Sequence, residues 1–484
     1  MRTKRVSVLE VSIWITLVIF TLLAFSPFIV GYKAKSDYAN LINQLSKISN
    51  LDLQITNYSQ GFFSSKATLA LNLPSYSETL VFKEEIVHGP VYLGLISQDK
   101  SPFVAAVING KLDVESAAFT KLTKLLSGNS PVFYQHLIGF NGNVDSQAYV
   151  PAIKTIINEG SESVNLESSG AIYTQFISST DESVKGELTV PLFEIKDNNF
   201  AMILKDSVVS FSGKKGINQL MIGDSVISVG VLNIDSAHEQ FAVKKLVVHS
   251  LSSEEGQMIN SGAQISAREV LASNQKFGPV ALNMSLNGLD VPSLLQIEKM
   301  KLSLDKQKSQ GVEADKINSL MINQLAEIMP ALIKKAKANI NPLSVNSELG
   351  RLEADMEFKL IGLAEQMPID PIVLLNAIKF DLNISIDEPL IRKLFAWHLE
   401  NIDDDKSSTA LLGVKSENSH LLMSKKVDEN LDALMQINWL VKDENVYLSK
   451  ISMHQGELLV NDITVDALQQ IISSLGGDPG ATVQ

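Results

Sequence analysis

Apolar and polar residues alternate in many segments of the chain beyond residue 50. The alternation covers residues 51–55, 67–73, 282–286, 352–360, 380–386 and 437–441. A period of two gives a strand one apolar and one polar face, which is typical of antiparallel sheets with one solvated side. Continuous apolar runs of the kind found in buried parallel strands are scarce, so the pattern does not favour a doubly wound fold.

A period near 3.6 replaces the alternation in a few places. It predicts amphipathic helices at residues 115–128, 292–341, 370–379, 388–399 and 466–475. Pro330 is expected to kink the longest of them, because its ring clashes with the preceding turn. The expected fold class is therefore α+β, predominantly antiparallel β in an extended, curved or meandering sheet, with a few amphipathic helices and one N-terminal transmembrane helix.

The transmembrane helix is predicted from residues 11–30, which contain no charged residue. Twenty residues in a helix span about 30 Å, the thickness of a hydrocarbon core. Arg2, Lys4 and Arg5 precede the run and favour a cytoplasmic N-terminus. A cleaved signal peptide and a buried core helix are the alternatives. Pro27, directly after the small residues 24–26, and the length of the run favour an uncleaved anchor.

These patterns divide the chain into six regions. We expect a cytoplasmic tail at 1–10, a transmembrane helix at 11–32, a helical stalk at 33–50, a β-rich region at 51–290, a helical segment at 291–345 and a second β-rich region with short helices at 346–484. The long acidic remainder contains no second span, so it is expected on the far side of the membrane.

Composition narrows the partners of the chain. Hydrophobic residues make up 45% of the sequence and charged residues 20%, which is less charged than the roughly 25% of typical soluble domains and fits a membrane segment. The net charge of −13 argues against nucleic acid, because a phosphate backbone requires a basic face. The absence of cysteine excludes disulfides, thiolate metal sites and a thiol nucleophile.

Motifs that carry chemistry are not found in the sequence. Neither a nucleophile elbow nor a phosphate-binding or dinucleotide-binding glycine loop occurs in a strand-to-helix context. His238 opens "HEQFA", where a zinc-binding helix would need a second histidine at Ala242. The acidic run 402–406 is interpreted as a solvated loop. We therefore expect no enzymatic activity, no cofactor and no metal.

Residues 51–90 predict three strands and a corner. Gly61 supplies the turn of a hairpin at 51–73, and a third strand at 80–87 closes at His88. Gly89 and Pro90 end that strand, because proline cannot donate to a ladder. His88 could act as a base or as a hydrogen-bonding side chain at the corner. The corner interpretation is favoured, because no nucleophile or second ligand accompanies the histidine in the sequence.

This order of motifs resembles the YdgA-like family of uncharacterised bacterial inner-membrane proteins. The resemblance is carried by Gly61, Phe62, Phe63, Ser64, Ser65, Ile86, His88, Gly89 and Pro90, and near the end by Tyr447, Gly456 and Asn461. Asn461-Asp462 stands where the family has Asn-Gly. The resemblance implies a single-pass protein of the inner membrane with a β-rich periplasmic body, and it supplies no catalytic residues.

Two hypotheses for function follow from these patterns. The first is a non-enzymatic envelope protein that binds an envelope partner or a second copy of itself. The second is a carrier of phospholipid or another hydrophobic ligand, held in an apolar groove on one sheet face, with Met356, Phe358, Ile384 and Ile386 as its candidate lining. The alternative for those residues is a packed core beneath the helices.

Overall fold

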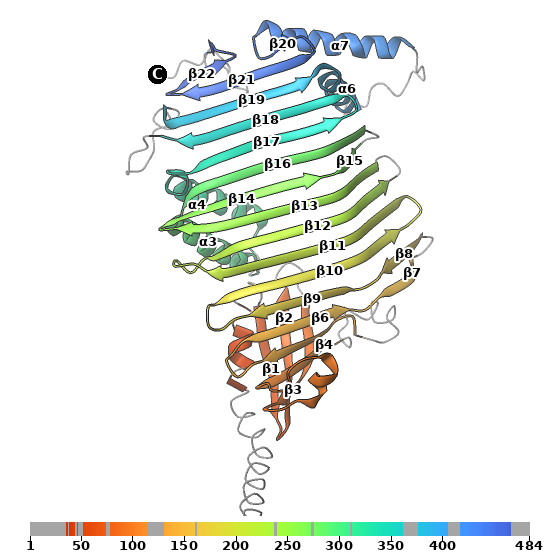
Figure 1. The fold of residues 1–484 in the computed structure, drawn as a ribbon, viewed down its shortest axis with the longest axis vertical. Helices are drawn as coiled ribbons and strands as arrows, with labels where there is room; N and C mark the ends of the chain where they lie inside the picture. The colour runs from red at the N-terminus through yellow and green to blue at the C-terminus, as the bar shows by residue number, and fades with distance from the viewer. Residues whose placement is uncertain are drawn as a thin grey trace, which may run out of the picture. The chain divides into compact units, whose positions relative to one another are not determined.

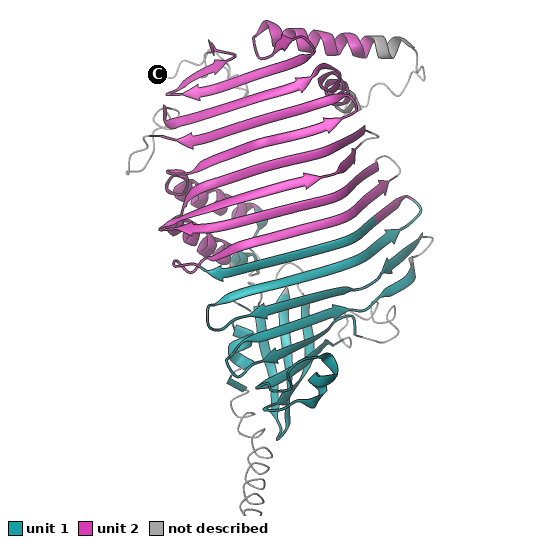
Figure 2. Ribbon diagram, in the orientation of Figure 1, with its two compact units in different colours: residues 1–198, 203–215, 305–314 teal, residues 199–202, 216–304, 315–484 magenta. Residues whose placement is uncertain are grey.

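The computed structural model describes the greater part of the chain. The described residues are 35–36, 38–43, 46, 52–73, 78–113, 130–159, 162–236, 240–272, 275–309, 312–361, 376–404 and 417–465. The protein is mostly antiparallel β-structure with few helices (Figure 1). It divides into two compact units, unit 1 with residues 1–198, 203–215 and 305–314, and unit 2 with residues 199–202, 216–304 and 315–484 (Figure 2).

Unit 1 is built on an antiparallel sheet formed mainly by strands that are neighbours in the sequence. Its strands are β1 (Asp52–Gln60), β2 (Ser64–Leu73), β3 (Glu78–His88), β4 (Ala106–Leu112), β5 (Phe133–Ile138), β6 (Val144–Val150), β7 (Ile153–Glu159), β8 (Glu162–Ser168), β9 (Ala171–Ile177), β10 (Ser183–Lys196) and most of β11 (Phe200–Lys215). β1 to β6 pair in sequence order, β6 pairs with β9, and β10 pairs with both β8 and β9. A short 3-10 helix, η1 (Leu93–Gln98), lies between β3 and β4.

Unit 2 continues the same antiparallel pattern with long strands. They are β12 (Met221–Ser236), β13 (Gln240–Glu255), β14 (Met258–Ala267), β15 (Glu269–Ala272), β16 (Gln275–Asp290), β17 (Lys337–Ser347), β18 (Gly350–Leu360), β19 (Ile378–Asp387), β20 (Val441–Asp443), β21 (Val446–His454), β22 (Glu457–Val460) and β23 (Ile463–Val465). The helices α3 (Val291–Ser309) and α4 (Ala314–Ile333) separate β16 from β17, and α6 (Glu388–Asp404) and α7 (Glu417–Gln436) separate β19 from β20.

Each unit has its own buried core. In unit 1, Tyr38, Leu41 and Ile42 from the helical residues near the N-terminus pack on the inner sides of β2 to β4. In unit 2, buried residues of α6 and α7 such as Leu390 and Leu431 pack against the ends of β19 and β21. Both cores arise because the alternation of each strand turns one apolar row toward an amphipathic helix.

Most of the predicted elements are confirmed. The hairpin at 51–73 is β1 and β2, the third strand is β3, and the alternating segments at 282–286, 352–360 and 380–386 lie in β16, β18 and β19. The predicted helix at 292–341 is two helices, α3 and α4, with Pro330 inside the second, and its last residues belong to β17. The predicted helix at 388–399 is the first part of α6.

The predicted strand at 437–441 is wrong. α7 ends at Gln436, and Ile437 and Trp439 donate their backbone N–H groups to the carbonyls of Ala433 and Leu434, which caps the helix. Asn438 adopts a left-handed conformation with φ of 59°, as residues that close a helix commonly do. The strand β20 begins only at Val441, so the apolar residues that suggested alternation close a helix instead.

Some predicted elements lie wholly or partly outside the residues that the structure describes. The predicted helices at 115–128 and 466–475, the tail 1–10 and the span 11–32 lie outside the described residues. The predicted helix at 370–379 is described only from Asn376, and its last two residues, Ile378 and Lys379, are the start of β19. Within the described ranges, no helix has the length and apolarity needed to cross a membrane.

Candidate functional site

The family-motif residues of the first ninety positions meet at one corner of unit 1. His88, at the end of β3, is 3% exposed, and its Nε2 lies 2.9 Å from the Oγ of the buried Ser65 at the start of β2. Its Nδ1 lies 3.2 Å from the carbonyl oxygen of Phe62 in the β1–β2 turn. A ring that donates from Nδ1 to the Phe62 carbonyl and accepts at Nε2 from the Ser65 hydroxyl satisfies both contacts. His88 thus ties the turn to the end of β3.

Two glycines of the motif allow close backbone approaches at this corner. The Gly61 N–H donates to the carbonyl oxygen of Ser64 at 2.9 Å, and a Cβ at Gly61 would lie 2.4 Å from that oxygen. The Gly89 N–H donates to the carbonyl oxygen of Ala105 at 2.8 Å. A Cβ at Gly89 would lie 1.9 Å from the carbonyl oxygen of Val104. Only glycine fits at these positions without moving backbone.

Replacing His88 by alanine is expected to lower the free energy of unfolding of unit 1 by about 2 kcal/mol, because the buried Ser65 hydroxyl and the partly buried Phe62 carbonyl each lose a partner. Chemical denaturation of the full chain, followed through hydrogen exchange of β2 and β3, measures this loss. The double variant with Ser65→Ala should cost about 1 kcal/mol less than the sum of the two single variants. Additive losses would show that the two side chains do not interact.

A buried carboxylate lies beside this corner and was not singled out in the sequence. Glu84 is 4% exposed, and both Tyr38 and Tyr134 donate their hydroxyl groups to it. Burial raises the pKa of Glu84 above its usual value, although the two hydrogen bonds oppose the shift. Burial, together with the nearby Glu84, raises the pKa of both tyrosines. The three side chains connect the N-terminal helical residues to β3 and β5.

The C-terminal motif residues build the edge of unit 2. Tyr447 is 2% exposed within the cluster of α6 and α7. Gly456 has φ of 80° in the turn between β21 and β22. Asn461 has φ of 48°, accepts the Lys450 N–H at Oδ1 over 2.8 Å, and donates from Nδ2 to the Asn438 carbonyl over 2.7 Å. Asp462, with φ of 64°, completes the turn between β22 and β23, as aspartate tolerates that conformation.

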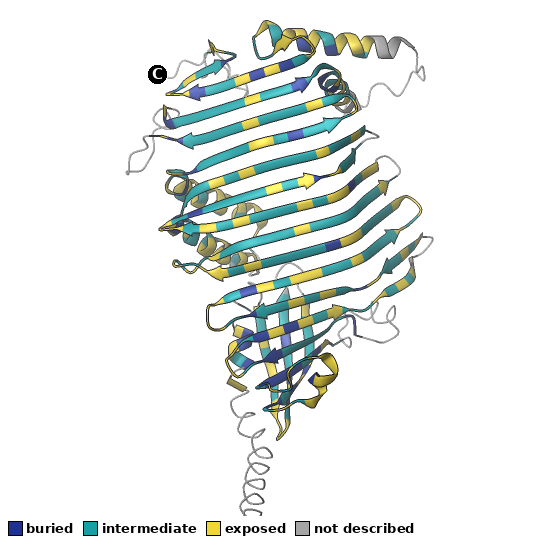
Figure 3. Cartoon of the chain, in the orientation of Figure 1, coloured by how far each residue is buried: buried dark blue, intermediate teal, exposed yellow. Residues whose placement is uncertain are grey.

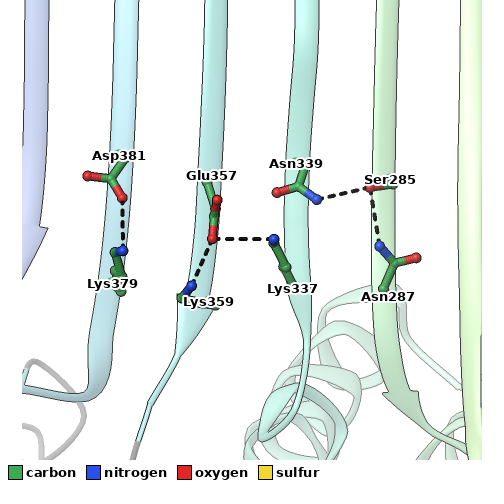
Figure 4. Close-up of polar contacts among 8 residues, drawn as sticks. All are labelled: Ser285, Asn287, Lys337, Asn339, Glu357, Lys359, Lys379 and Asp381. Carbon is green, nitrogen blue, oxygen red and sulfur yellow. Dashed lines mark hydrogen bonds and ion pairs between the residues drawn. The ribbon is translucent and has the colours of Figure 1, made fainter.

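The sheet of unit 2 has a polar face with paired charges (Figure 4). Lys337 and Lys359 lie 3.4 Å and 2.9 Å from the same carboxylate oxygen of Glu357. The ammonium of Lys359, together with that of Lys337, holds the pKa of Glu357 below its usual value. Asn339 donates to the Ser285 hydroxyl at 3.3 Å. A trough of about 740 Å³ lies here, and amide, hydroxyl and charged side chains line it together with apolar residues such as Leu251, Met284 and Met356.

The opposite face of the same strands is apolar. We call it the apolar face and define it by the apolar members of three rows that run across β14, β16, β17, β18, β19 and β21 in register; the first row ends on Ser449 in β21 and the third begins on Ser261 in β14. The rows are Ile265, Leu282, Leu343, Ala354 and Ile384, then Ala263, Met284, Ile340, Met356, Leu382 and Ile451, then Leu286, Ala338, Phe358, Phe380 and Met453. With strands about 4.8 Å apart and residues about 3.3 Å apart along a strand, these rows extend over roughly 24 Å by 13 Å.

The apolar face is not packed as a core. In β16, Met284 and Leu286 are 39% and 38% exposed, whereas Ser285 and Asn287 on the polar face are half-buried. Among the described residues, none of the buried hydrophobic clusters includes a member of the three rows, and Met453 in β21 is the one member that is buried. The centres of the strands are neither deeply buried nor fully exposed (Figure 3).

The four candidate groove residues do not share one environment. Met356, Phe358 and Ile384 are half-buried on the apolar face. Ile386 is 5% exposed and packs with Leu390 in the α6 cluster, so it belongs to the core that closes this end of the face. Three buried residues lie at the other end of the face. They are Ile259 in β14, Ala336 just before β17 and Leu360 at the end of β18.

Charged side chains on the polar face of unit 2 form ion pairs with one another. In the part of the chain that the structure describes, no three or more His, Asp and Glu side chains are grouped to hold a metal ion. The acids and bases of the polar face are paired with each other, which is typical of a solvated surface. The apolar face differs, because a contiguous exposed apolar surface on a folded domain usually marks a binding site.

Comparison with known proteins gives a family without an assigned activity. No curated protein and no solved structure matches the chain. A family model described as "Bacterial protein of unknown function (DUF945)" matches residues 8–467. The match extends over both units and nearly the whole sequence. The chain therefore belongs to this bacterial family of unknown function, DUF945.

Proposed function

We propose that the chain is a non-enzymatic protein of the bacterial cell envelope, anchored by residues 11–32, that binds the acyl chains of lipids on the apolar face of unit 2. The exposure of Met284 and Leu286, on a strand whose polar neighbours are half-buried, carries this proposal. A sheet buries its apolar face against another layer, and contiguous exposed apolar surface of a few hundred Å² usually marks a binding site.

The chemistry of the face fits acyl chains. Apart from Ser261 and Ser449 at the two edges, its rows consist of aliphatic, methionine and phenylalanine side chains, which offer apolar contact surface. The backbone groups of the strands are paired in the ladders, so a ligand here needs no polar partner. Methionine side chains such as Met284 and Met356 adapt to ligands of varied shape. Because Met284 and Leu286 of β16 are exposed, we favour a lipid over a protein partner or a second copy as the ligand of the apolar face.

The envelope location rests on sequence and family. The family is bacterial, and the motif order resembles that of YdgA-like inner-membrane proteins. The charge-free run 11–30, preceded by three basic residues, supports a single span with the N-terminus in the cytoplasm and the bulk of the chain in the periplasm. In that position the apolar face has a lipid source within reach.

Photo-crosslinking in cells tests the proposal. A photoreactive residue in place of Phe358 or Ile384 on the apolar face should form adducts with phospholipid labelled with radioactive phosphate. Ser385 is the matched control, because it neighbours Ile384 in β19, is half-buried like it, and faces the polar side. Adducts with protein alone at 358 and 384, whether another protein or a second copy, would contradict lipid binding. Equal lipid labelling at 385 would also contradict it.

A further inference from the structure

A second apolar surface lies in unit 1, at the end of the sheet where the motif corner is found. Seven large apolar side chains are exposed there, and we call them the rim. They are Phe62, Phe63, Val91, Leu93, Ile96, Phe103 and Phe140. Their exposed fractions reach 62% for Phe63, 69% for Leu93 and 66% for Phe103. Residues 61–63 and all of η1 except Leu95 are exposed.

The antiparallel register gathers the rim from three connections. The β1–β2 turn, the β3–β4 connection and the β5–β6 turn all leave the sheet at the same end, because His88 pairs with Ala106, Ala106 with Ile138 and Ile138 with Val144. Backbone hydrogen bonds hold these connections on the strand ends, and the Ala105 N–H of the β3–β4 connection donates to the carbonyl of Ile138 at the end of β5 at 2.8 Å. The His88 N–H donates to the Phe63 carbonyl at 2.8 Å, and the Tyr92 N–H donates to the Pro102 carbonyl at 2.8 Å. These backbone hydrogen bonds therefore hold the rim in a defined arrangement.

The three connections are almost free of charge. In residues 61–63, 89–105 and 139–143, Asp99 and Lys100 are the only charged residues, in a chain that is 20% charged overall. The Lys100 ammonium lies 3.6 Å from the carboxylate of Asp145. A surface that is apolar, aromatic and without net charge is disfavoured in water and favoured in the interfacial layer of a bilayer.

The chain enters unit 1 at this same end. The ammonium of Lys35 lies 5.6 Å from the centre of the Tyr58 ring, near the end of β1 and next to the β1–β2 turn. Residues 33–35 follow the predicted span 11–32, and three residues bridge at most roughly 11 Å. From Tyr58 to the turn at Gly61 is about 10 Å of strand. A chain anchored by residues 11–32 therefore holds the rim within reach of the bilayer surface.

We propose that the rim is a membrane-docking surface, with Phe63, Leu93 and Phe103 inserted among the lipids at the surface from which the anchor emerges. Docking fixes the orientation of unit 1 on the membrane, which attachment at a single point does not. The proposal shares the anchor with the function proposed above but does not depend on lipid binding by unit 2.

The absence of cysteine in the chain gives a direct test. The full chain in lipid nanodiscs carries one introduced cysteine, Leu93→Cys or Phe103→Cys, labelled with a fluorophore. Thr79→Cys is the matched control, because it is exposed at the opposite end of β3. Phospholipids with a spin label near the headgroup should quench the probes at 93 and 103 at least threefold more than the probe at 79. Equal quenching at all three positions would overturn the proposal.

A second variant separates docking from mere proximity. Phe63→Asp combined with Phe140→Asp places two charges in the rim at exposed positions, so the fold should persist, as circular dichroism would check. Docking predicts that quenching of the probe at 103 then falls to the level of the probe at 79. Unchanged quenching, or a rim that is shielded only by a second copy of the chain in crosslinking, would contradict a lipid partner. Phospholipid adducts at Phe358 should be unaffected, so failure of one proposal leaves the other testable.

Discussion

Replacing Glu84 by leucine is expected to lower the free energy of unfolding of unit 1 by about 4 kcal/mol. The reason is that the hydroxyl groups of Tyr38 and Tyr134 both donate to this carboxylate and would be left buried without an acceptor, at a cost of about 2 kcal/mol each. The loss should appear in hydrogen exchange of β3 and β5 in the full chain, and as release of the N-terminal helical residues from the sheet.

Two further variants test the cause of that loss. Glu84→Gln keeps an acceptor oxygen and should cost less than half as much as Glu84→Leu. Combining Glu84→Leu with Tyr38→Phe and Tyr134→Phe removes all the polar groups together and should recover most of the stability, because no unpaired donor remains. If the triple variant is no more stable than Glu84→Leu alone, the carboxylate acts through packing and not through its hydrogen bonds.

The same carboxylate predicts a pH dependence with a definite sign. Burial raises the pKa of Glu84 in the folded chain above its usual 4.5, so the folded state holds the proton more tightly than the unfolded state. The stability contributed by this group is complete below about pH 4.5 and is lost as pH rises through the raised pKa. The stability of Glu84→Gln relative to the wild type should therefore increase over that interval. A constant difference between the two proteins would contradict the shift.

Replacing Gly89 by alanine is the second change with a large expected effect. The added Cβ would lie 1.9 Å from the carbonyl oxygen of Val104 and 2.8 Å from that of Ala105, so the start of β4 must move. We expect a loss of about 3 kcal/mol in the free energy of unfolding of unit 1. Circular dichroism and denaturant titration of the full chain would measure it.

Gly94→Ala is the matched control, five residues further along the same connection. A Cβ at Gly94 meets only ring atoms of Tyr92 at 3.0 Å, which can rotate away, so the cost should stay below about 1 kcal/mol. Comparable losses for the two variants would mean that the connection as a whole resists substitution. The close approach of Gly89 to β4 would then not be the reason for its presence in the family motif.

The strands could be predicted from the sequence where apolar and polar residues alternate without a break. In residues 352–360 and 380–386 every second residue is apolar, and both segments form strands with one apolar face. The alternation is harder to follow where a single residue breaks it. Asp206 in β11 and Lys245 in β13 have φ of 51° and 52°, a left-handed conformation in the middle of a strand. Such local conformations leave little trace in a pattern of apolar positions.

The residues of the candidate sites could also be predicted from the sequence only in part. The corner of His88, Gly89 and Pro90 was predictable because glycine and proline have strong backbone preferences. The period of two in β3 places Glu84 on the same face as Phe82 and Ile86, and this was a usable signal for a buried carboxylate. Its partners Tyr38 and Tyr134 were not predictable, because they are 46 and 50 residues away and meet Glu84 only in the folded sheet.

The meander of unit 2 has a consequence for how the chain can vary in length. From β12 to β14 and from β16 to β19 each strand pairs with the next along the chain, and no closing contact joins a first strand to a last one in these runs. Such an arrangement is quasi-one-dimensional, like a solenoid, and its contacts are local in sequence. Adding or removing a pair of strands would lengthen or shorten the apolar face by about 10 Å and leave the register of the remaining strands unchanged.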